Sequence, residues 1–344
     1  MSREVAIVGA GAAGAAAATM LNDLGTVTVF EAEDAVGGRS RTRARDGCQF
    51  EIGANYLTAT DERVNALIEE RIPAAELLEL QGDVWTFDGA GTIEEGHGTD
   101  SRRLTCHEGL SRIPSALLET VSAELILETR IDALELTEGD WRIRDAEGQD
   151  HGIFDAVVLT PPAPLTADIL GRSEWSHADC RNVREAIESV PYRPITSVAL
   201  HYPFDIDRPW YAAVNDDGEH PISWIAREDA KPSHVPDGET VLLVQCSSEF
   251  TIESYDADTV DVVDRVSALT ADLLDDERLA APDWSEHHCW RYAVPEPGVS
   301  TAELDCAEDH DLYAAGDWVV GEDRLNGALR SGLQTGETVR DALE

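Results

Sequence analysis

Six residues near the start of the chain, Gly9-Ala10-Gly11-Ala12-Ala13-Gly14, form the pattern G-x-G-x-x-G. The pattern follows an apolar strand-like run, residues 4–8, and opens an Ala-rich stretch, residues 12–24, that is typical of a helix. The first glycine would allow a tight turn, the second would let the backbone approach a pyrophosphate, and the third would let helix and strand pack closely. The amides at the helix start would then face the phosphates. We therefore expect all six residues to bind a dinucleotide; the alternative is a tight strand-to-helix turn without a ligand.

A second strand-like run, residues 26–30, ends at Glu31, which lies 22 residues beyond Gly9. A carboxylate at this distance can accept hydrogen bonds from the ribose hydroxyls of a bound dinucleotide. It would also repel a 2′-phosphate, so the favoured ligand carries an adenosine without that phosphate. Glu31 and the following Ala32 are therefore predicted to contact the cofactor.

The next residues distinguish FAD from NAD. They read Ala32-Glu33-Asp34-Ala35-Val36-Gly37-Gly38-Arg39. An acid that closes a strand, followed by Gly-Gly-Arg, resembles the signature of the FAD-dependent amine oxidase superfamily. The two glycines would admit a second stretch of backbone to the dinucleotide, and Arg39 would offset phosphate charge. We expect FAD, with Gly38 and Arg39 among its contacts. Arg41, Arg43 and Arg45 either assist them or belong to a salt-bridged surface loop.

The end of the chain resembles a second fingerprint of the same superfamily. Residues 312–317 read as a strand that ends in Gly316-Asp317, and the resemblance implies that Asp317 binds the ribityl chain. A helix expected from about residue 326 to 342 would begin at the flavin, with Asn326, Gly327 and Ala328 at its N-terminus. Ile131 matches the position whose backbone pairs with adenine; the alternative is an ordinary strand residue.

One segment narrows the resemblance to renalases. It reads Glu51-Ile52-Gly53-Ala54-Asn55-Tyr56-Leu57-Thr58, with Asn55 where the renalase pattern has Gln. Residues 107–111, 158–164 and 290–292 also resemble renalase segments, so the resemblance covers essentially the whole chain. It is specific in the FAD-binding part and loose elsewhere. Gly53, Ala54 and Asn55 are thereby implied as FAD contacts.

The expected fold class is α/β, and 344 residues suffice for two domains. The resemblance implies a Rossmann-like FAD-binding domain of the p-hydroxybenzoate hydroxylase and amine oxidase type. We expect this domain to be discontinuous, at residues 1–75, 101–162 and 284–344. An interleaved α+β substrate domain, residues 76–100 and 163–283, is expected to be built on an antiparallel sheet.

The resemblance also implies a reaction. Renalases oxidise the 2- and 6-dihydro isomers of NAD(P) by hydride transfer to flavin N5, and O2 then reoxidises the flavin and yields H2O2. Because aromatisation of the nicotinamide drives the transfer, orientation suffices and no strong base is required. The residues expected at the reaction centre are Asn55, Tyr56, Trp290 and Tyr292. More typical of the core are Trp210, Tyr211, Trp224, His201, His287 and His288.

An amine oxidase is the main alternative. Many such enzymes hold a water at the flavin with a lysine, whereas the only lysine here, Lys231, lies in a polar stretch. We therefore expect that role to be unfilled. Cys289 and Cys306 lack the Cys-Tyr context of covalent attachment, so we expect the FAD to be non-covalent.

Two further alternatives are less favoured. A carotenoid desaturase-like enzyme would need a longer chain and an apolar membrane-docking surface. A flavin-free binding protein of the same fold would not need the glycines of residues 9–14, Glu31 and Asp317.

The charge balance is extreme, with 68 Asp and Glu against 26 Lys and Arg and a net charge of −42. Such self-repulsion destabilises a compact protein unless salt screens it. The acids are spread along the chain, which favours adaptation to high salt, as in halophilic archaea, over an acidic patch that binds a cationic partner. Nucleic acid is excluded as a partner because its phosphates would be repelled.

The six cysteines contain no C-x-x-C pair and no zinc-finger spacing. We therefore expect no metal, and reduced thiols in a cytoplasmic protein. No run approaches the roughly 20 apolar residues of a membrane span, and the start of the chain does not resemble a secretory signal. The expected partners are a small-molecule substrate and O2, with the chain a monomer or a homodimer.

Overall fold

The computed structural model describes residues 3–96, 101–175, 178–296, 299, 301–322 and 324–344. One half is built on a five-stranded parallel sheet of order β10-β2-β1-β14-β20. Its central strands are short and apolar, as is typical of a parallel sheet that is covered on both faces. Residues from both ends of the chain thereby meet at one carboxyl edge. The strands are β1 (Arg3–Val8), β2 (Gly25–Phe30), β10 (Ala123–Ile126), β14 (Ala156–Leu159) and β20 (Leu312–Ala314).

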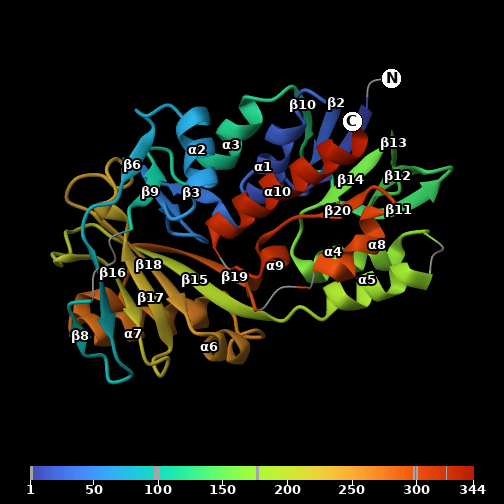
Figure 1. Cartoon of the computed structure of the whole chain (residues 1–344). Helices are drawn as coiled ribbons and strands as arrows, with labels where there is room; N and C mark the ends of the chain where they lie inside the picture. Colours follow the sequence, from blue (N-terminus) through green and yellow to red (C-terminus); the bar gives the residue numbers. More distant parts are fainter. Residues whose placement is uncertain (1–2, 97–100, 176–177, 297–298, 300, 323) are drawn as a thin grey trace.

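Two helices from opposite ends of the chain cover one face of this sheet. Helix α1 (Ala12–Leu21) and helix α10 (Leu325–Leu343) lie side by side (Figure 1). Their close approach depends on glycine, because a Cβ added at Gly332 would lie 2.2 Å from the Ala13 carbonyl oxygen. The last helix is therefore fixed against the helix that follows the glycine-rich turn.

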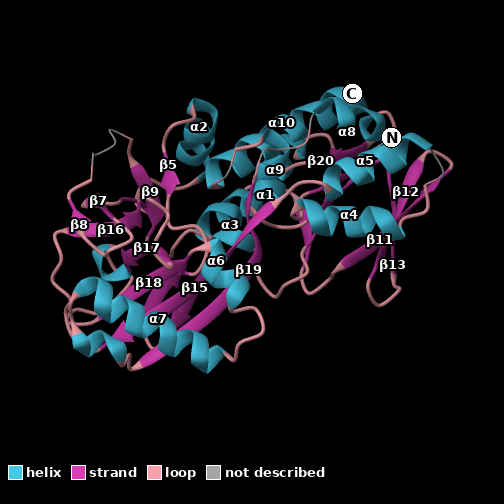
Figure 2. Cartoon of the chain, turned by 90° about the horizontal axis from the view of Figure 1, so that it is seen from below, coloured by secondary structure: helices cyan, strands magenta, loops and turns pink. Residues whose placement is uncertain are grey.

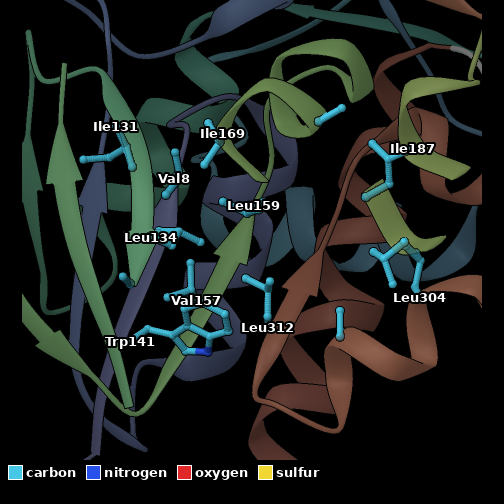
Figure 3. Close-up of a cluster of buried hydrophobic side chains, with 14 of the residues drawn as sticks. Val8, Ile131, Leu134, Trp141, Val157, Leu159, Ile169, Ile187, Leu304 and Leu312 are labelled. Carbon is cyan, nitrogen blue, oxygen red and sulfur yellow. The ribbon is translucent and has the colours of Figure 1, made fainter. Parts of the chain in front are cut away.

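The opposite face is covered by a small antiparallel sheet and by helices. Figure 3 shows Val8, Val157 and Leu159 of the parallel sheet in one buried cluster with Ile131, Leu134 and Trp141. Strand alternation explains why neighbouring residues such as Ile7 and Val158 enter the other cluster, beneath α1 and α10. The covering elements are β11 (Ile131–Thr137), β12 (Asp140–Asp145), β13 (Asp150–Phe154), α4 (Ala163–Arg172) and α5 (Ala178–Glu188).

The other half is built on a seven-stranded sheet of order β19-β15-β18-β17-β16-β7-β8. Helix α7 (Thr259–Leu274) packs on one face (Figure 2), and strand β4 (Cys48–Glu51) packs on the other. The strands are β7 (Asp83–Phe87), β8 (Ile93–Glu94), β15 (Tyr192–Tyr202), β16 (Trp210–Asn215), β17 (Ile222–Arg227), β18 (Thr240–Cys246) and β19 (Trp284–Pro295).

The expectation of an antiparallel substrate sheet is wrong at one pair of strands, because β7 runs parallel to β16. These strands come from separate segments of the chain, so no tight hairpin forces them to run in opposite directions. The α/β class and the two-part architecture are confirmed.

The predicted domain boundaries remain a prediction, and two segments pack across them. Strand β19, expected in the FAD-binding part, pairs along most of β15 at the edge of the seven-stranded sheet. Helices α4 and α5, expected in the substrate part, contribute Ala163, Ala167 and Ile187 to the core beneath the parallel sheet.

The remaining elements are short. No described helix is both long enough and apolar enough to cross a membrane. The elements are β3 (Thr42–Arg45), β5 (Leu57–Thr58), β6 (Leu77–Glu79), β9 (Arg103–Cys106), α2 (Glu62–Arg71), α3 (Arg112–Glu119), α6 (Ser248–Glu253), α8 (Thr301–Glu308), α9 (Asp317–Val320), η1 (Gly38–Ser40), η2 (Glu228–Ala230) and η3 (Glu277–Ala280).

Candidate functional site

The glycine-rich turn joins β1 to α1, and its three glycines have different surroundings. Gly9 has a φ of +103°, and a Cβ there would lie 2.4 Å from Thr160 Oγ1. A Cβ at Gly14 would lie 2.0 Å from the Gly9 carbonyl oxygen. Packing therefore requires these two glycines. A Cβ at Gly11, in contrast, would meet nothing closer than 4.0 Å. The space above Gly11 is open to a ligand.

The Gly37-Gly38 segment lies against the same turn. The Gly37 amide donates to the Ala10 carbonyl at 3.1 Å, and Gly37 forms a parallel bridge with Gly11. A Cβ at Gly38 would come no closer than 3.6 Å to the Gly11 Cα. Gly11 and Gly38 together leave a cradle that side chains would fill, which is the shape that a pyrophosphate requires.

Glu31 is buried at the end of β2 and faces the turn. Its carboxylate accepts hydrogen bonds from the Ala10 amide at 2.8 Å and from the Glu33 amide at 3.1 Å. These bonds fix the carboxylate beside the turn. The next residues, Ala32 to Asp34, line an open cavity of about 840 Å³ together with residues 41–44, Glu128 and Glu286.

Arg39 joins the two predicted fingerprints. Its guanidinium donates to both carboxylate oxygens of Asp317, at 2.7 and 2.8 Å, and to the Ala293 carbonyl at 3.0 Å. Asp317 follows Gly316 at the end of β20 and opens α9. The structure therefore brings together the residues predicted for the phosphate and for the ribityl chain, which lie 278 positions apart in the sequence.

The arginines that follow Arg39 form ion pairs. Arg41 pairs with Asp34 at 2.7 Å, Arg43 pairs with Glu286, and Arg45 pairs with Asp46 at 3.5 Å. These ion pairs agree with the salt-bridged alternative, but Thr42–Arg45 form strand β3 rather than a loop, and Arg41 and Arg43 also line the cavity beside Ala32 to Asp34.

The segment Gly53-Ala54-Asn55 packs against the backbone of Arg39. The Ala54 amide donates to the Arg39 carbonyl at 2.9 Å, and a Cβ at Gly53 would lie 2.1 Å from the same oxygen. Gln245 of β18 donates to the Gly53 carbonyl at 2.7 Å, and its Oε1 lies 3.4 Å from Asn55 Nδ2. Asn55 Oδ1 is buried without a hydrogen-bond partner. Sequence reasoning missed Gln245, because no motif marks it.

The start of α10 is anchored to the same region. Asn326 Nδ2 donates to the Thr58 carbonyl and to Thr60 Oγ1, while Asn326 Oδ1 is buried without a partner. A Cβ at Gly327 would lie 2.1 Å from the Glu322 carbonyl oxygen, and Ala328 is half-buried behind it. The helix N-terminus is thus held beside the segment that contains Asn55.

Aromatic side chains gather where the two halves of the molecule meet. The ring centroids of Tyr56, Tyr211 and Trp224 lie 6.1 to 6.5 Å apart. Trp290 Nε1 donates to the Ile52 carbonyl at 2.9 Å, and Tyr292 packs edge-on against Tyr192 at 5.6 Å. The structure therefore gathers Tyr56 with Tyr211 and Trp224, whereas Trp210 is buried on the α7 face of the sheet. Tyr211 is buried in a hydrophobic cluster against which Trp224 packs, as expected of core residues, and Tyr56 packs against the same cluster.

Comparison with known families decides what this arrangement is. Residues 7–71 match a NAD(P)-binding Rossmann-like domain, and residues 75–339 match the flavin containing amine oxidoreductase family. The chain belongs to the flavin containing amine oxidoreductase family. This membership confirms the expected flavin cofactor and places the chain among FAD-dependent oxidoreductases.

The matches to curated relatives cover only a small part of this chain. It is 42% identical over 69 residues to protoporphyrinogen oxidase 2 of Arabidopsis thaliana, which covers 20% of this chain and 14% of that protein. It is 42% identical over 71 residues to putrescine oxidase of Kocuria rosea, which covers 20% of this chain and 15% of that protein.

Solved structures resemble the whole chain in fold. The putative protoporphyrinogen oxidase from Exiguobacterium sp. 255-15 has a TM-score of 0.79 at 16% identity, over 99% of both chains. Cyclohexylamine oxidase from Brevibacterium oxydans has a TM-score of 0.76 at 14% identity, over 100% of both chains. At these identities the likeness shows the fold alone.

The backbone position predicted for adenine is at the start of β11. The Ile131 side chain points into the hydrophobic core (Figure 3) and is 5% exposed. Only the backbone of Ile131 is available to a ligand, which agrees with the predicted backbone contact to adenine.

Lys231 lies in a different environment from the one expected. It lies in a turn just after η2, as expected, but its side chain is buried and its Nζ donates to both Glu228 oxygens at 3.0 Å. His234 and Glu51 are buried in the same group, and the Lys231 Nζ lies 5.9 Å from the centre of the Tyr211 ring. The lysine thus lies beside the aromatic group of Tyr56, Tyr211 and Trp224, and the buried Glu228 holds it there.

Proposed function

We propose that this chain holds one FAD non-covalently and oxidises a dihydronicotinamide isomer, a 2- or 6-dihydro form of NAD(P). FAD, when bound, would accept a hydride from this substrate, and its reoxidation by O2 with uptake of one proton would give H2O2, so that the products are NAD(P)+ and H2O2. The observation that carries the proposal is a group of buried, uncharged and unpaired polar atoms on the wall that faces the Gly53–Tyr56 segment.

The same geometry supports a division of the cofactor among the residues of this chain. Gly9 to Gly14 and Gly38 would cradle the pyrophosphate, with Glu31 and Ala32 at the ribose and the Ile131 backbone at adenine. Arg39, Gly316 and Asp317 would meet the middle of the cofactor. The flavin end would lie against Gly53, Ala54, Asn55, Asn326, Gly327 and Ala328. FAD, when bound, supplies an acceptor for a hydride at N5.

The wall is a row across the seven-stranded sheet. Gln245 is the register partner of both Ser197 and Trp224, so the three side chains share one face. Ser197 Oγ and Trp224 Nε1 are buried without partners, as are Tyr211 Oη and Asn55 Oδ1. Trp224 Nε1 can donate, Asn55 Oδ1 can accept, and the two hydroxyls can do either, which matches a carboxamide on a flat ring.

Charge supports a neutral ring over an ammonium group. The two carboxylates buried beside the wall are already bonded: Glu228 to Lys231, and Glu51 to Thr42 and to the Leu110 amide. The aromatic rings of Tyr56 and Tyr211 would hold the nicotinamide against the flavin. Orientation of this kind supplies most of the catalysis that hydride transfer needs.

An amine oxidase is the second candidate. Solved structures of putrescine oxidase and cyclohexylamine oxidase share the fold, and an aromatic wall can also hold a cation. Lys231 could serve in such an enzyme only by leaving Glu228. Because the Lys231 ammonium group is already bonded to Glu228, this lysine favours the nicotinamide substrate over an amine.

Anaerobic reduction distinguishes the two candidates. The flavin absorption of the purified holoenzyme should bleach within one turnover on addition of 2- or 6-dihydro-NAD(P), and should persist with putrescine and with cyclohexylamine. Rapid bleaching by amines alone would overturn the proposal. Acid precipitation checks the attachment, because the yellow colour should pass to the supernatant.

A further inference from the structure

Three residues that are distant in the sequence meet beside the seven-stranded sheet. Cys48 begins β4, His201 lies near the end of β15, and Glu239 precedes β18. One ligand atom from each lies within 4.8 Å of the others. Cys48 is 1% exposed and His201 is 5% exposed, whereas the Glu239 side chain is 35% exposed. The cluster is therefore closed on the protein side and open at the glutamate.

The histidine is held in one orientation. Its ring stacks on Trp284 with the planes 2° apart and the centroids 4.8 Å apart. His201 Nε2 lies 2.9 Å from Glu239 Oε2, and Nδ1 lies 3.6 Å from Asp283 Oδ2. The 2.9 Å contact is a hydrogen bond from Nε2–H to the carboxylate, and Nδ1 is buried without a hydrogen-bond partner. A cation bound between His201 and Glu239 would take the place of the proton on Nε2.

The donor set has a defined preference. A thiolate, an imidazole and a carboxylate are the three side-chain types that bind zinc in proteins. Thiolate and imidazole do not suit magnesium or calcium, which select oxygen. Three protein ligands leave a fourth tetrahedral position, and the exposed side of Glu239 admits a water there. The charges of the thiolate and the carboxylate would balance a divalent cation.

We propose that Cys48, His201 and Glu239 form a binding site for a divalent transition metal ion of the zinc type. The site lies outside the flavin machinery, and its effect is mechanical. Cys48 belongs to the strand that leads through Glu51 to Gly53 and Asn55, whereas His201 and Glu239 belong to the substrate sheet. The bound ion would join these two parts and fix the flavin segment against the wall that receives the substrate.

The test uses the FAD-loaded full chain. After removal of metals with a chelator and dialysis against Zn2+, the protein should retain one equivalent by elemental analysis. It should also unfold at a higher temperature than the metal-free protein, because a ligand that binds only the folded state stabilises it. Co2+ should give a thiolate charge-transfer band and visible d–d bands beyond the flavin absorption.

Variants assign the ligands. Glu239→Gln changes a partly exposed side chain with little effect on packing, and it should abolish retention of the ion, as should Cys48→Ala. Cys246→Ala, a buried thiol of β18 outside the cluster, should keep one equivalent. Absence of bound metal in the unmodified protein, a Co2+ complex without a thiolate band, or equal retention by Glu239→Gln would each overturn the proposal.

Discussion

At the scale of single residues, the structure separates two kinds of glycine within one motif. Gly9 and Gly14 are required by the protein itself, because any side chain there would collide with Thr160 or with the turn. Gly11 is required neither by packing nor by its backbone conformation, since its Cβ position is open and its φ is −78°. A glycine that packing does not require is explained by a ligand that comes close to the backbone. The two kinds can be told apart by substitution.

Gly14→Ala and Gly11→Ala should therefore have opposite effects. A Cβ 2.0 Å from the Gly9 carbonyl oxygen forces the helix away from the strand, so Gly14→Ala should lower the free energy of unfolding by about 1–3 kcal/mol. Gly11 has a φ of −78°, which alanine tolerates. Gly11→Ala should keep the stability of the apoprotein but lower FAD affinity by roughly tenfold or more. Thermal unfolding of apoprotein and titration with FAD measure both, and normal FAD affinity in Gly11→Ala would contradict the assignment.

Gln245 gives a second test at this scale. Gln245→Leu would leave the Gly53 carbonyl without its donor, at a cost of about 1–3 kcal/mol if that carbonyl stays buried. We expect the flavin segment to shift and reduction by substrate to slow by roughly tenfold. Stopped-flow reduction measures this rate. The matched control is Gln81→Leu, an exposed residue whose amide bonds only to Glu79; equal rates in both variants would show that Gln245 does not position the segment.

At the scale of elements, the turn from η2 to His234 shows how charge can mislead sequence reasoning. Its residues are polar and were expected in a loop, yet Glu228, Lys231 and His234 are buried. The acid and the lysine pair locally, and His234 Nε2 lies 3.1 Å from the Cys106 carbonyl, 128 residues away in the sequence. Burial alone would raise the pKa of Glu228, but Lys231 and His234 hold that pKa below its ordinary value. Burial, opposed by Lys231, raises the pKa of the neighbouring Glu51 to about 7.

The raised pKa of Glu51 predicts a pH dependence of stability. Between the ordinary value of 4.5 and about 7, the folded chain retains a proton on Glu51 that the unfolded chain has lost. The contribution of Glu51 to the free energy of unfolding therefore falls as the pH rises through this window. Glu51→Gln removes this titration. The free energy of unfolding of the variant, relative to that of the parent, should therefore rise by roughly 1–3 kcal/mol between pH 4.5 and 7.5. Denaturant unfolding at fixed salt measures the difference, and a constant difference would contradict the raised pKa.

Local patterns predict elements well where the pattern is complete. The first strand and helix α10 lie within a few residues of their predicted bounds. Between β4 and β5 no continuous strand forms, because Gly53 and Ala54 bend around the Arg39 backbone. The twelve residues of β19 were not predicted as one strand, since their pattern is set by pairing with β15. The glycine, acid and Gly-Asp motifs could be found in the sequence, whereas Gln245 and the Cys48 cluster arise only from contacts between distant segments.

At the scale of the whole molecule, charge is the dominant feature. The net charge is −42, and the ion pairs that the described residues form are mostly at the surface, where each contributes only about 0–1 kcal/mol. The repulsion among the remaining acids acts over the Debye length, which is about 30 Å at 0.01 M salt and about 3 Å at 1 M. A compact state of this charge therefore depends on screening.

We accordingly expect the protein to need salt to stay folded. Raising KCl from 0.01 to 2 M should raise the melting temperature steeply at first and then level off, because the Debye length shortens most in the low range. Sucrose at matched osmolality is the control, since it favours burial without screening charge. Flavin retention should follow the same curve. The elements that hold the cofactor site, β1, α1 and α10, belong to the core that the charged surface surrounds, so they should unfold with it. A melting temperature that is independent of KCl, or that rises equally with sucrose, would show that self-repulsion does not limit stability.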